Sequence, residues 1–438
     1  MASFTAHWSE QEVVAPARAT PYELKYLSDI DNQRSLRFYQ TIIEFFRGRP
    51  GVAHDPAAFI KSGLSEALVF FYPLAGRLRE IPLDGRLIVE CTAEGVTFVE
   101  ADADVTLLEF GEPLLPPYPC VEELLCDLGD SKDILAKPLA FFQVTRFRCG
   151  GFSVGMLLCH TMYDAVGVFK FLEAIGDMAR GEPQPTVLPV WERELLTSCS
   201  APSITRAHLG YEPLADGDTA DDVMQTTPSA DMIGQYFFFG PAEISAIRSS
   251  VPESLAKRST VFELLAAVTW RCRTAALGYE PNKLVRFIVT LQSHIVFPVA
   301  ETTASELCGN PLSHALELVH KAKSEANDEY VRSTVELLAS RKWPAVVLDR
   351  TFVVSDLTAL GEDRIDFGWG KRIAGGVPMA ADILTKLLSY FMKCKGADGE
   401  DCIVVPMYLP KTAMDTFAAQ ISIWTKKPSS RTAATSSL

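Results

Sequence analysis

The fold of this chain is decided around His160–Gly167, which reads HTMYDAVG. The apolar run before it, Phe152–Cys159, is typical of a buried strand, and the apolar residues of Ala165–Ala179 recur at helical spacing. A histidine at a strand–helix junction can face a cavity with its ring nitrogens free, as a general base requires. We therefore interpret His160 as a candidate catalytic base.

Asp164 follows His160 by four residues, and the sequence leaves its role open. Its carboxylate is a good N-cap that would accept hydrogen bonds from the amides of residues 166 and 167, and this reading is as strong as a catalytic one. His160 and Asp164 could also bind a metal ion, but the sequence offers no third ligand nearby. We predict no metal site.

The neighbouring sequence predicts a mixed α/β fold. Two glycines separate Phe141–Cys149 from Phe152–His160, a pattern that predicts a β-hairpin. The patterns predict helices at Asn32–Arg47, Ala57–Tyr72, Ser259–Ala276, Asp328–Ser340 and Thr412–Trp424, and strands at Leu87–Cys91, Val96–Glu100, Tyr236–Phe239, Leu284–Leu291 and Cys402–Leu409. The proline-rich stretch from Gly181 to Asp222 predicts a linker between two halves, and residues 429–438 a frayed tail.

Gly151–Gly155 matches the Gly-x-Ser-x-Gly pattern of hydrolase nucleophiles. In those enzymes the serine sits between a strand and a helix. Here the motif begins in the hairpin turn and continues as a strand, so we reject Ser153 as a nucleophile.

Composition limits the possible partners and compartment. The chain has 438 residues, 48% of them hydrophobic, and a formal charge of −14, which argues against nucleic acid or an anionic membrane as a partner. Its ten cysteines form no Cys-x-x-Cys pair, as expected for a reduced intracellular protein. We find neither a signal peptide nor an apolar run of about 18 residues, and expect a cytoplasmic monomer.

A second unusual string, Asp366–Gly370 (DFGWG), lies far downstream. Together with the His-x-x-x-Asp motif it resembles the BAHD acyltransferases of plants. Further passages agree with that family in order and spacing: Tyr72–Arg77, Ser259–Glu263, Trp270–Arg273 and Ile403–Pro406. The opening segments Val14–Pro16 and Glu23–Asp31 look most like the branch of benzyl alcohol O-benzoyltransferases, enzymes of specialised metabolism.

The resemblance implies two α/β domains of chloramphenicol-acetyltransferase type with mixed sheets, at residues 1–180 and 223–438, joined by a long crossover at 181–222. A channel between them would admit acyl-CoA from one side and a small alcohol or amine from the other. Acyl-CoA would be a co-substrate, with no permanently bound cofactor. The expected reaction is acyl transfer, benzoyl or acetyl for example, with His160 as base and no covalent intermediate.

The resemblance also assigns roles to individual residues. Trp369 is a candidate donor to the oxyanion, and the CoA phosphates would be contacted by Lys257, Arg258, Ser259 and Thr260. The remaining motif residues are expected to be structural: Asp164, Gly167, Asp366, Gly368 and Gly370. We also expect the positive end of the helix beginning at Ala165 to keep His160 neutral.

The chain departs from the family where an Arg-Ser-Arg-like segment is usual, since it reads Gln292-Ser293-His294. One of those arginines would pair with Asp164. Either His294 replaces it, or Arg286 reaches Asp164, or the site is weakened. This departure leaves open a homologue that binds CoA or a metabolite with little catalysis. Amide formation also stays open, because the motifs do not distinguish an amine from an alcohol acceptor.

Overall fold

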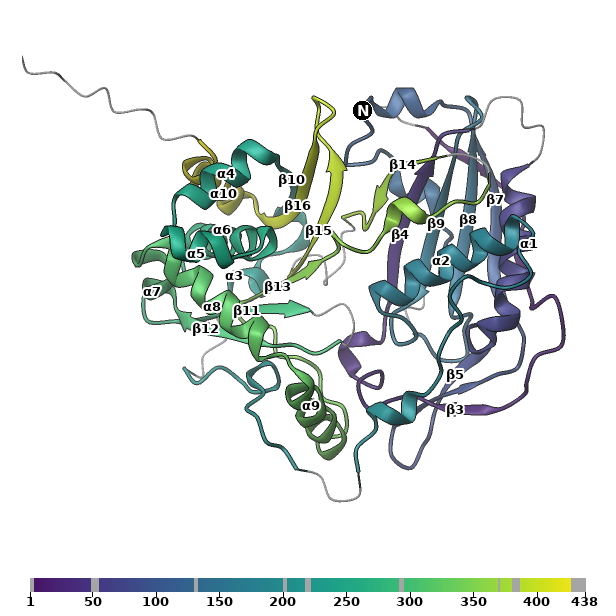
Figure 1. Ribbon diagram of the computed structural model, residues 1–438, viewed down its shortest axis with the longest axis horizontal. Coiled ribbons are helices and arrows are strands. Elements are labelled where there is room, and N and C mark those ends of the chain that lie inside the picture. The colour runs from purple at the N-terminus through teal and green to yellow at the C-terminus, as the bar shows by residue number, and fades with distance from the viewer. Residues whose placement is uncertain are drawn as a thin grey trace, which may run out of the picture.

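The computed structural model describes residues 4–48, 55–129, 133–199, 203–216, 222–290, 295–368, 371–379 and 387–426. Two large sheets, each covered by helices, lie side by side (Figure 1). The predicted mixed α/β class is confirmed. Within the described residues, no helix has both the length and the apolar character needed to cross a bilayer. The predicted tail at 429–438 lies outside the described residues.

The first sheet has the order β1-β7-β8-β9-β4-β14, and β2 also pairs with β7. Its strands are β1 (Ala6–Trp8), β2 (Glu12–Val14), β4 (Tyr39–Phe46), β7 (Val96–Ala103), β8 (Ala140–Phe147), β9 (Phe152–Cys159) and β14 (Arg372–Gly376). The predicted hairpin is confirmed, because β8 and β9 pair antiparallel across a turn in which Gly150 has a φ of 79°. Ser153 lies within strand β9 and is buried, so the hydrolase-like pattern is not at a strand–helix turn.

The predicted helix at Asn32–Arg47 is wrong. A short 3-10 helix, Arg34–Leu36, is followed by strand β4, which lies between β9 and β14. The second half of β4, Ile42–Phe46, is buried without alternation, and an apolar run of that kind does not distinguish a strand from a helix by periodicity. Pairing on both edges decides for the strand, and the β-branched residues from Thr41 to Ile43 suit it.

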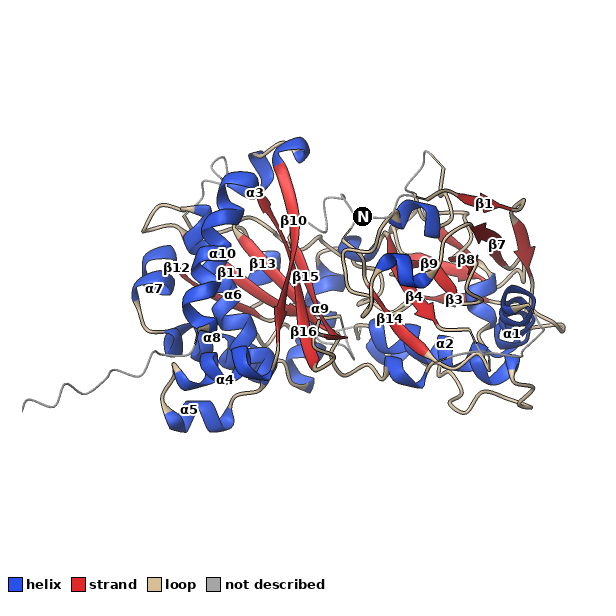
Figure 2. Cartoon of the chain, turned by 90° about the horizontal axis from the view of Figure 1, so that it is seen from above, coloured by secondary structure: helices blue, strands red, loops and turns tan. Residues whose placement is uncertain are grey.

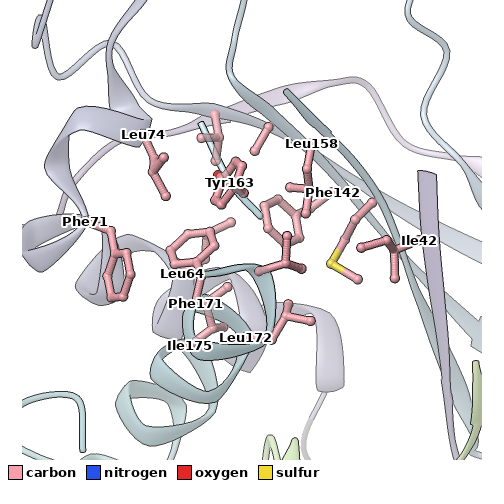
Figure 3. Packing of buried hydrophobic residues seen from close by; sticks show 14 of the residues in the cluster. Ile42, Leu64, Phe71, Leu74, Phe142, Leu158, Tyr163, Phe171, Leu172 and Ile175 are labelled. Carbon is pink, nitrogen blue, oxygen red and sulfur yellow. The ribbon is translucent and has the colours of Figure 1, made fainter. Parts of the chain in front are cut away.

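Helices α1 (Pro56–Phe70) and α2 (Ala165–Ala179) pack against each other and cover the first sheet. Asp55 caps α1 by accepting from the amide of Ala57 at 3.1 Å, and Pro56 occupies its first turn. The helices meet closely at Gly63, where a Cβ would lie 2.5 Å from the carbonyl oxygen of Ile175. Figure 3 shows Phe171 and Leu172 of α2 packed with Leu64, Phe71 and Phe142. Burial of one phenylalanine contributes about 1.5–3 kcal/mol.

The second sheet has the order β10-β16-β15-β13-β11-β12. Its strands are β10 (Met232–Phe239), β11 (Leu284–Thr290), β12 (Val299–Thr303), β13 (Thr351–Asp356), β15 (Leu388–Lys395) and β16 (Asp401–Pro410). The helices of this half are α3 (Val223–Thr226), α4 (Pro241–Ser249), α5 (Glu253–Arg258), α6 (Val261–Leu277), α7 (Ala304–Gly309), α8 (Leu312–Glu325), α9 (Asp328–Ser340) and α10 (Lys411–Thr425). Seen from above, α6, α8 and α10 lie on one side of this sheet and the first sheet lies on the other (Figure 2).

A small third sheet consists of β3 (Leu24–Tyr26), β5 (Arg77–Glu80) and β6 (Leu87–Glu90). Apart from Asn32–Arg47, the predicted helices and strands occur in the structure with ends that differ by a few residues. The helix at Asp328–Ser340 has the predicted bounds. These segments combine strong periodicity with clear end signals, such as the Thr260–Glu263 capping box of α6.

Strand β14 belongs to the later part of the sequence but pairs with β4 of the first sheet. The division into 1–180 and 223–438 stays a prediction, and β14 is one strand that crosses it. The buried Glu44 holds β14, because Arg372 Nε donates to its Oε2 at 2.6 Å. A Cβ on Gly375 would lie 2.5 Å from the carbonyl oxygen of Ile43, and this residue has a φ of 150°, so the close approach requires glycine.

Candidate active site

The end of strand β9 positions His160. Its amide donates to the carbonyl oxygen of Phe38 at 2.9 Å, and the two rings lie 4.9 Å apart between centroids. The hydroxyl of Thr161 donates to the carbonyl oxygen of Leu36 at 3.0 Å. The turn that carries His160 is therefore held against residues 36–38, which lead into β4.

The imidazole of His160 is half-buried and lines a cavity. Its Nδ1 atom is buried and has no hydrogen-bond partner among the described residues. Burial lowers the pKa of His160 from its ordinary value. The ring is therefore neutral at neutral pH, the form a general base needs. Desolvation is the main cause, whereas the sequence argument relied on the helix dipole.

Asp164 caps helix α2. Its Oδ1 accepts from the amide of Gly167 at 2.6 Å, and its own backbone is extended, which confirms the predicted cap through one of the two expected amides. Burial raises the pKa of Asp164, and this hydrogen bond opposes the rise. No ion pair of Asp164 occurs within the part of the chain that the structure describes.

The proposed partner Arg286 does not reach Asp164. It is buried in the second half, where its Nε donates to Glu301 at 2.6 Å and its guanidinium also donates to the carbonyl oxygen of Glu212 at 2.7 Å. That alternative is therefore wrong. Gln292 and His294 lie outside the described residues. Arg193 contacts this turn, because it donates to the carbonyl oxygen of Met162 at 3.0 Å, and it pairs with Asp31.

The cavity beside His160 has a volume of about 150 Å³ and is lined by both halves of the chain. The first half contributes β4, the end of β9 and the start of α2, and the second contributes the ends of β11, β13 and β15. Most lining side chains are aliphatic or aromatic, such as Phe38, Val168, Phe169, Leu348 and Leu388. Asp164 is the one lining residue with a formal charge among those that the structure describes.

A few uncharged polar groups interrupt this apolar wall. Tyr390 Oη donates to Gln40 Oε1 at 2.5 Å, and Ser35 accepts from the amide of Val346 at 2.8 Å. Thr290 and Ser355 are register partners on the parallel strands β11 and β13, and both line the cavity. The sequence reasoning missed these residues because they lie on different strands, and no local motif connects them.

The DFGWG motif docks on the C-terminal end of α2. The carboxylate of Asp366 accepts from the amide of Gly368 at 2.7 Å, and its carbonyl oxygen accepts from Arg180. Gly368 has a φ of 80°, which favours glycine. Phe367 packs on Phe46 of β4, with ring centroids 5.1 Å apart. These contacts agree with a structural role for Asp366 and Gly368; Trp369 and Gly370 lie outside the described residues.

The four predicted CoA contacts lie at the α5–α6 junction and do not line the cavity beside His160. Thr260 forms a capping box with Glu263, and the hydroxyl of Thr260 accepts from the amide of Glu263 at 3.2 Å. Ser259 donates to the carbonyl oxygen of Leu255 at 2.8 Å. Lys257 is exposed and pairs with Glu253 at 2.6 Å. Contact of these residues and Arg258 with CoA stays a prediction.

The chain is similar to several plant acyltransferases. Acyl transferase 1 of Oryza sativa is 44% identical, with 97% of each chain covered. Benzyl alcohol O-benzoyltransferase of Nicotiana tabacum is 45% identical over 95% of this chain and 93% of the relative. Spermidine hydroxycinnamoyltransferase 1 of Oryza sativa is 43% identical over 90% of this chain and 93% of the relative.

Two solved structures share the fold. Vinorine synthase superposes with a TM-score of 0.69 at 17% identity, covering 97% of this chain and 99% of its own. TRI101 of F. sporotrichioides, solved with coenzyme A and T-2, superposes with a TM-score of 0.66 at 17% identity, covering 91% of this chain and 97% of its own. The fold is therefore the expected chloramphenicol-acetyltransferase-like one.

The model of the family described as "Transferase family" matches residues 5–423. This match spans both sheets, the His-x-x-x-Asp turn and the DFGWG motif. The chain therefore belongs to this transferase family, the BAHD acyltransferases, and is an acyltransferase.

Proposed function

We propose that this protein transfers an acyl group from a CoA thioester to the hydroxyl group of a small, uncharged alcohol. The observation that carries the proposal is a half-buried histidine of lowered pKa beside an apolar cavity. An apolar site of this kind favours both an uncharged histidine and an uncharged acceptor. Likeness to a relative named benzyl alcohol O-benzoyltransferase further supports a benzoyl or similar acyl group. The proposal also includes a role in plant specialised metabolism and a cytoplasmic monomer.

In the proposed chemistry, His160 first accepts a proton from the alcohol and later returns it to the CoA sulfur. Since Nδ1 of His160 is buried, Nε2 is the nitrogen that would accept the proton of the alcohol as its oxygen attacks the thioester carbonyl. The C–S bond of the tetrahedral intermediate then breaks, and the CoA sulfur takes the proton back. A thioester is already activated, so no covalent intermediate on the protein is required. General base catalysis contributes about 10²–10⁴-fold.

The size of the cavity supports an aromatic or short aliphatic group. An apolar cavity of about 150 Å³ in an unrelated protein accommodates benzene. The cavity beside His160 has the same volume and a wall of leucine, valine and phenylalanine side chains. A benzoyl group or a benzyl alcohol would therefore fit beside the histidine, and the tobacco relative is named for that pair.

An amine acceptor is the second candidate, because a relative is named for spermidine. Polyamines carry several positive charges at neutral pH, and moving an ammonium group into an apolar cavity costs several kcal/mol unless an anion pairs with it. Asp164 is the one carboxylate that lines the cavity among the described residues, and it already caps α2. This charge balance favours alcohols over polyamines.

The test is a matrix of benzoyl-CoA, acetyl-CoA and hydroxycinnamoyl-CoA against benzyl alcohol, aliphatic alcohols and spermidine. Ester formation with uncharged alcohols is the expected result. Amide formed from spermidine at a higher kcat/KM than any ester would favour the second candidate. Binding of CoA by calorimetry without product from any pair would instead identify a binding protein with little catalysis.

A further inference from the structure

Two cysteines face each other on neighbouring strands of the second sheet. Cys394 of β15 and Cys402 of β16 are register partners in an antiparallel ladder, and their Sγ atoms lie 3.0 Å apart. Directly opposed residues in such a ladder have Cα atoms about 4.5–5.5 Å apart. A disulfide spans about 4.4–6.8 Å between Cα atoms, so the backbone already suits this bond.

The surrounding hairpin holds the two sulfur atoms in register. The adjacent pair, Lys395 and Asp401, forms an ion pair at 2.5 Å, and the turn is closed by a hydrogen bond from the amide of Gly396 to the carbonyl oxygen of Glu400 at 2.7 Å. On the other side, Met392 is the register partner of Val404. The approach of the two thiols is therefore a property of a paired ladder with ordered neighbours on both sides.

The hairpin also contacts the first half and the cavity wall. Cys394 packs against a hydrophobic cluster to which both halves of the chain contribute. Two residues before it, the sulfur of Met392 accepts from the amide of Val377 at 3.2 Å, and Val377 lines the cavity beside His160. A covalent link between β15 and β16 would therefore stabilise the hairpin that contacts the wall of the cavity between the two halves.

We propose that Cys394 and Cys402 form a dithiol–disulfide site that exchanges with a low-molecular-weight disulfide such as oxidised glutathione. One thiolate attacks the glutathione disulfide, forms a mixed disulfide and releases one glutathione thiol. The second cysteine then attacks the protein sulfur of the mixed disulfide, forms the Cys394–Cys402 bond and releases the second glutathione. Each complete exchange oxidises two protein thiols and reduces one glutathione disulfide.

The environment of the pair determines how fast this exchange runs. Burial raises the pKa of both thiols, so the reactive thiolate is scarce at neutral pH. Exposed Cys149 and Cys199 offer an internal comparison. Their sulfur atoms should react first with a bulky reagent, whereas the Cys394–Cys402 pair should react slowly, faster at alkaline pH, and end as an internal bond.

The experiment compares the full-length reduced protein with the same protein incubated with oxidised glutathione at alkaline pH. Peptide mapping without reductant should join the peptides that contain Cys394 and Cys402. The melting temperature should rise by several degrees, because the bond restricts the unfolded chain. Dithiothreitol should reverse both changes. These measurements need no turnover, so they are independent of the proposed acyl transfer.

Matched variants separate this site from other thiols. Cys394→Ser and Cys402→Ser should lose both the linked peptide and the rise in melting temperature, whereas Cys149→Ser should keep both. Cys394→Ala serves as a second variant if the serine form does not fold. A link between other cysteines, a stable glutathione adduct without an internal bond, or the same rise in Cys394→Ser would overturn the proposal.

Discussion

Tyr390 and Gln40 join the two sheets through a hydrogen bond beside the candidate base. The phenol oxygen of Tyr390, on β15, donates to the amide oxygen of Gln40, on β4, at 2.5 Å. Both side chains line the cavity that His160 lines. Since these strands belong to different sheets, this bond helps set the width of the cavity.

Tyr390→Phe should therefore lower stability by about 0.5–1.5 kcal/mol, the usual net contribution of one hydrogen bond. It should also change KM for the acceptor more than kcat, because the cavity wall moves while His160 stays in place. Urea unfolding and kinetics with several alcohols would measure both effects. A double-mutant cycle with Gln40→Ala tests the pair; fully additive stability losses would contradict the coupling.

His160→Ala should reduce kcat/KM by about 10²–10⁴-fold, the contribution of a general base. CoA affinity, measured by calorimetry, should change little, because the variant removes a group that acts on the acceptor proton. His7→Ala is the matched control, since His7 is exposed on β1. Activity of the His160 variant within threefold of the parent would rule out the role.

The pH dependence of turnover should report the neutral form of His160. Burial lowers its pKa, so kcat/KM should rise with pH with a midpoint below the ordinary histidine pKa of about 6.5, and then level off. Initial rates between pH 4.5 and 8, with stability checked at each pH, would measure this. A midpoint well above 7 would mean that another group limits the reaction.

Glu44 should make stability depend on pH between about 4.5 and 7. Burial raises the pKa of Glu44 to about 7 although Arg372 opposes the rise. A carboxyl group whose pKa is raised on folding binds its proton more tightly in the native state. Its contribution is therefore fully present at low pH and is lost as pH rises toward 7. Glu44→Gln should flatten this part of the profile in urea unfolding; an identical slope in both proteins would contradict it.

Replacing Asp164 by alanine and by asparagine should change the stability of the protein by different amounts. Asp164→Ala removes the cap of α2 and should cost about 0.5–2 kcal/mol. Asp164→Asn keeps a capping oxygen and removes a buried charge whose pKa is raised, so it should be close to neutral or stabilising near pH 7. Thermal unfolding of both variants would measure these effects. A large loss of stability in the asparagine variant would indicate that Asp164 has a cationic partner.

Gln292→Arg also tests whether Asp164 has a cationic partner. If Asp164 has no cationic partner, an arginine where the family has one should raise the melting temperature and abolish the gain from Asp164→Asn. Gln292→Met, which has a similar length and no charge, is the control. An unchanged melting temperature in the arginine variant would show that Asp164 does not need the pair.

The local sequence was sufficient for the elements that have their own end signals. His160 at the end of β9, Asp164 as the cap of α2, and the helix α6 all follow from short-range hydrogen bonds and periodicity. The local sequence also indicated a tight turn in the DFGWG string, which agrees with the Asp366–Gly368 hydrogen bond and the positive φ of Gly368, whereas the structural roles of these residues were expected from the family resemblance.

Tertiary structure decided the rest, because it depends on pairing between residues that are far apart in the chain. Strand β4 was mistaken for a helix because burial on both faces removed its alternation, and only its edges with β9 and β14 show it to be a strand. The same long-range pairing brings Gln40 and Tyr390 to His160 and places Arg286 with Glu301 instead of Asp164. The sequence by itself determined the position of the candidate base His160 and the helix cap Asp164, whereas the wall of the cavity exists only once the two sheets are packed together.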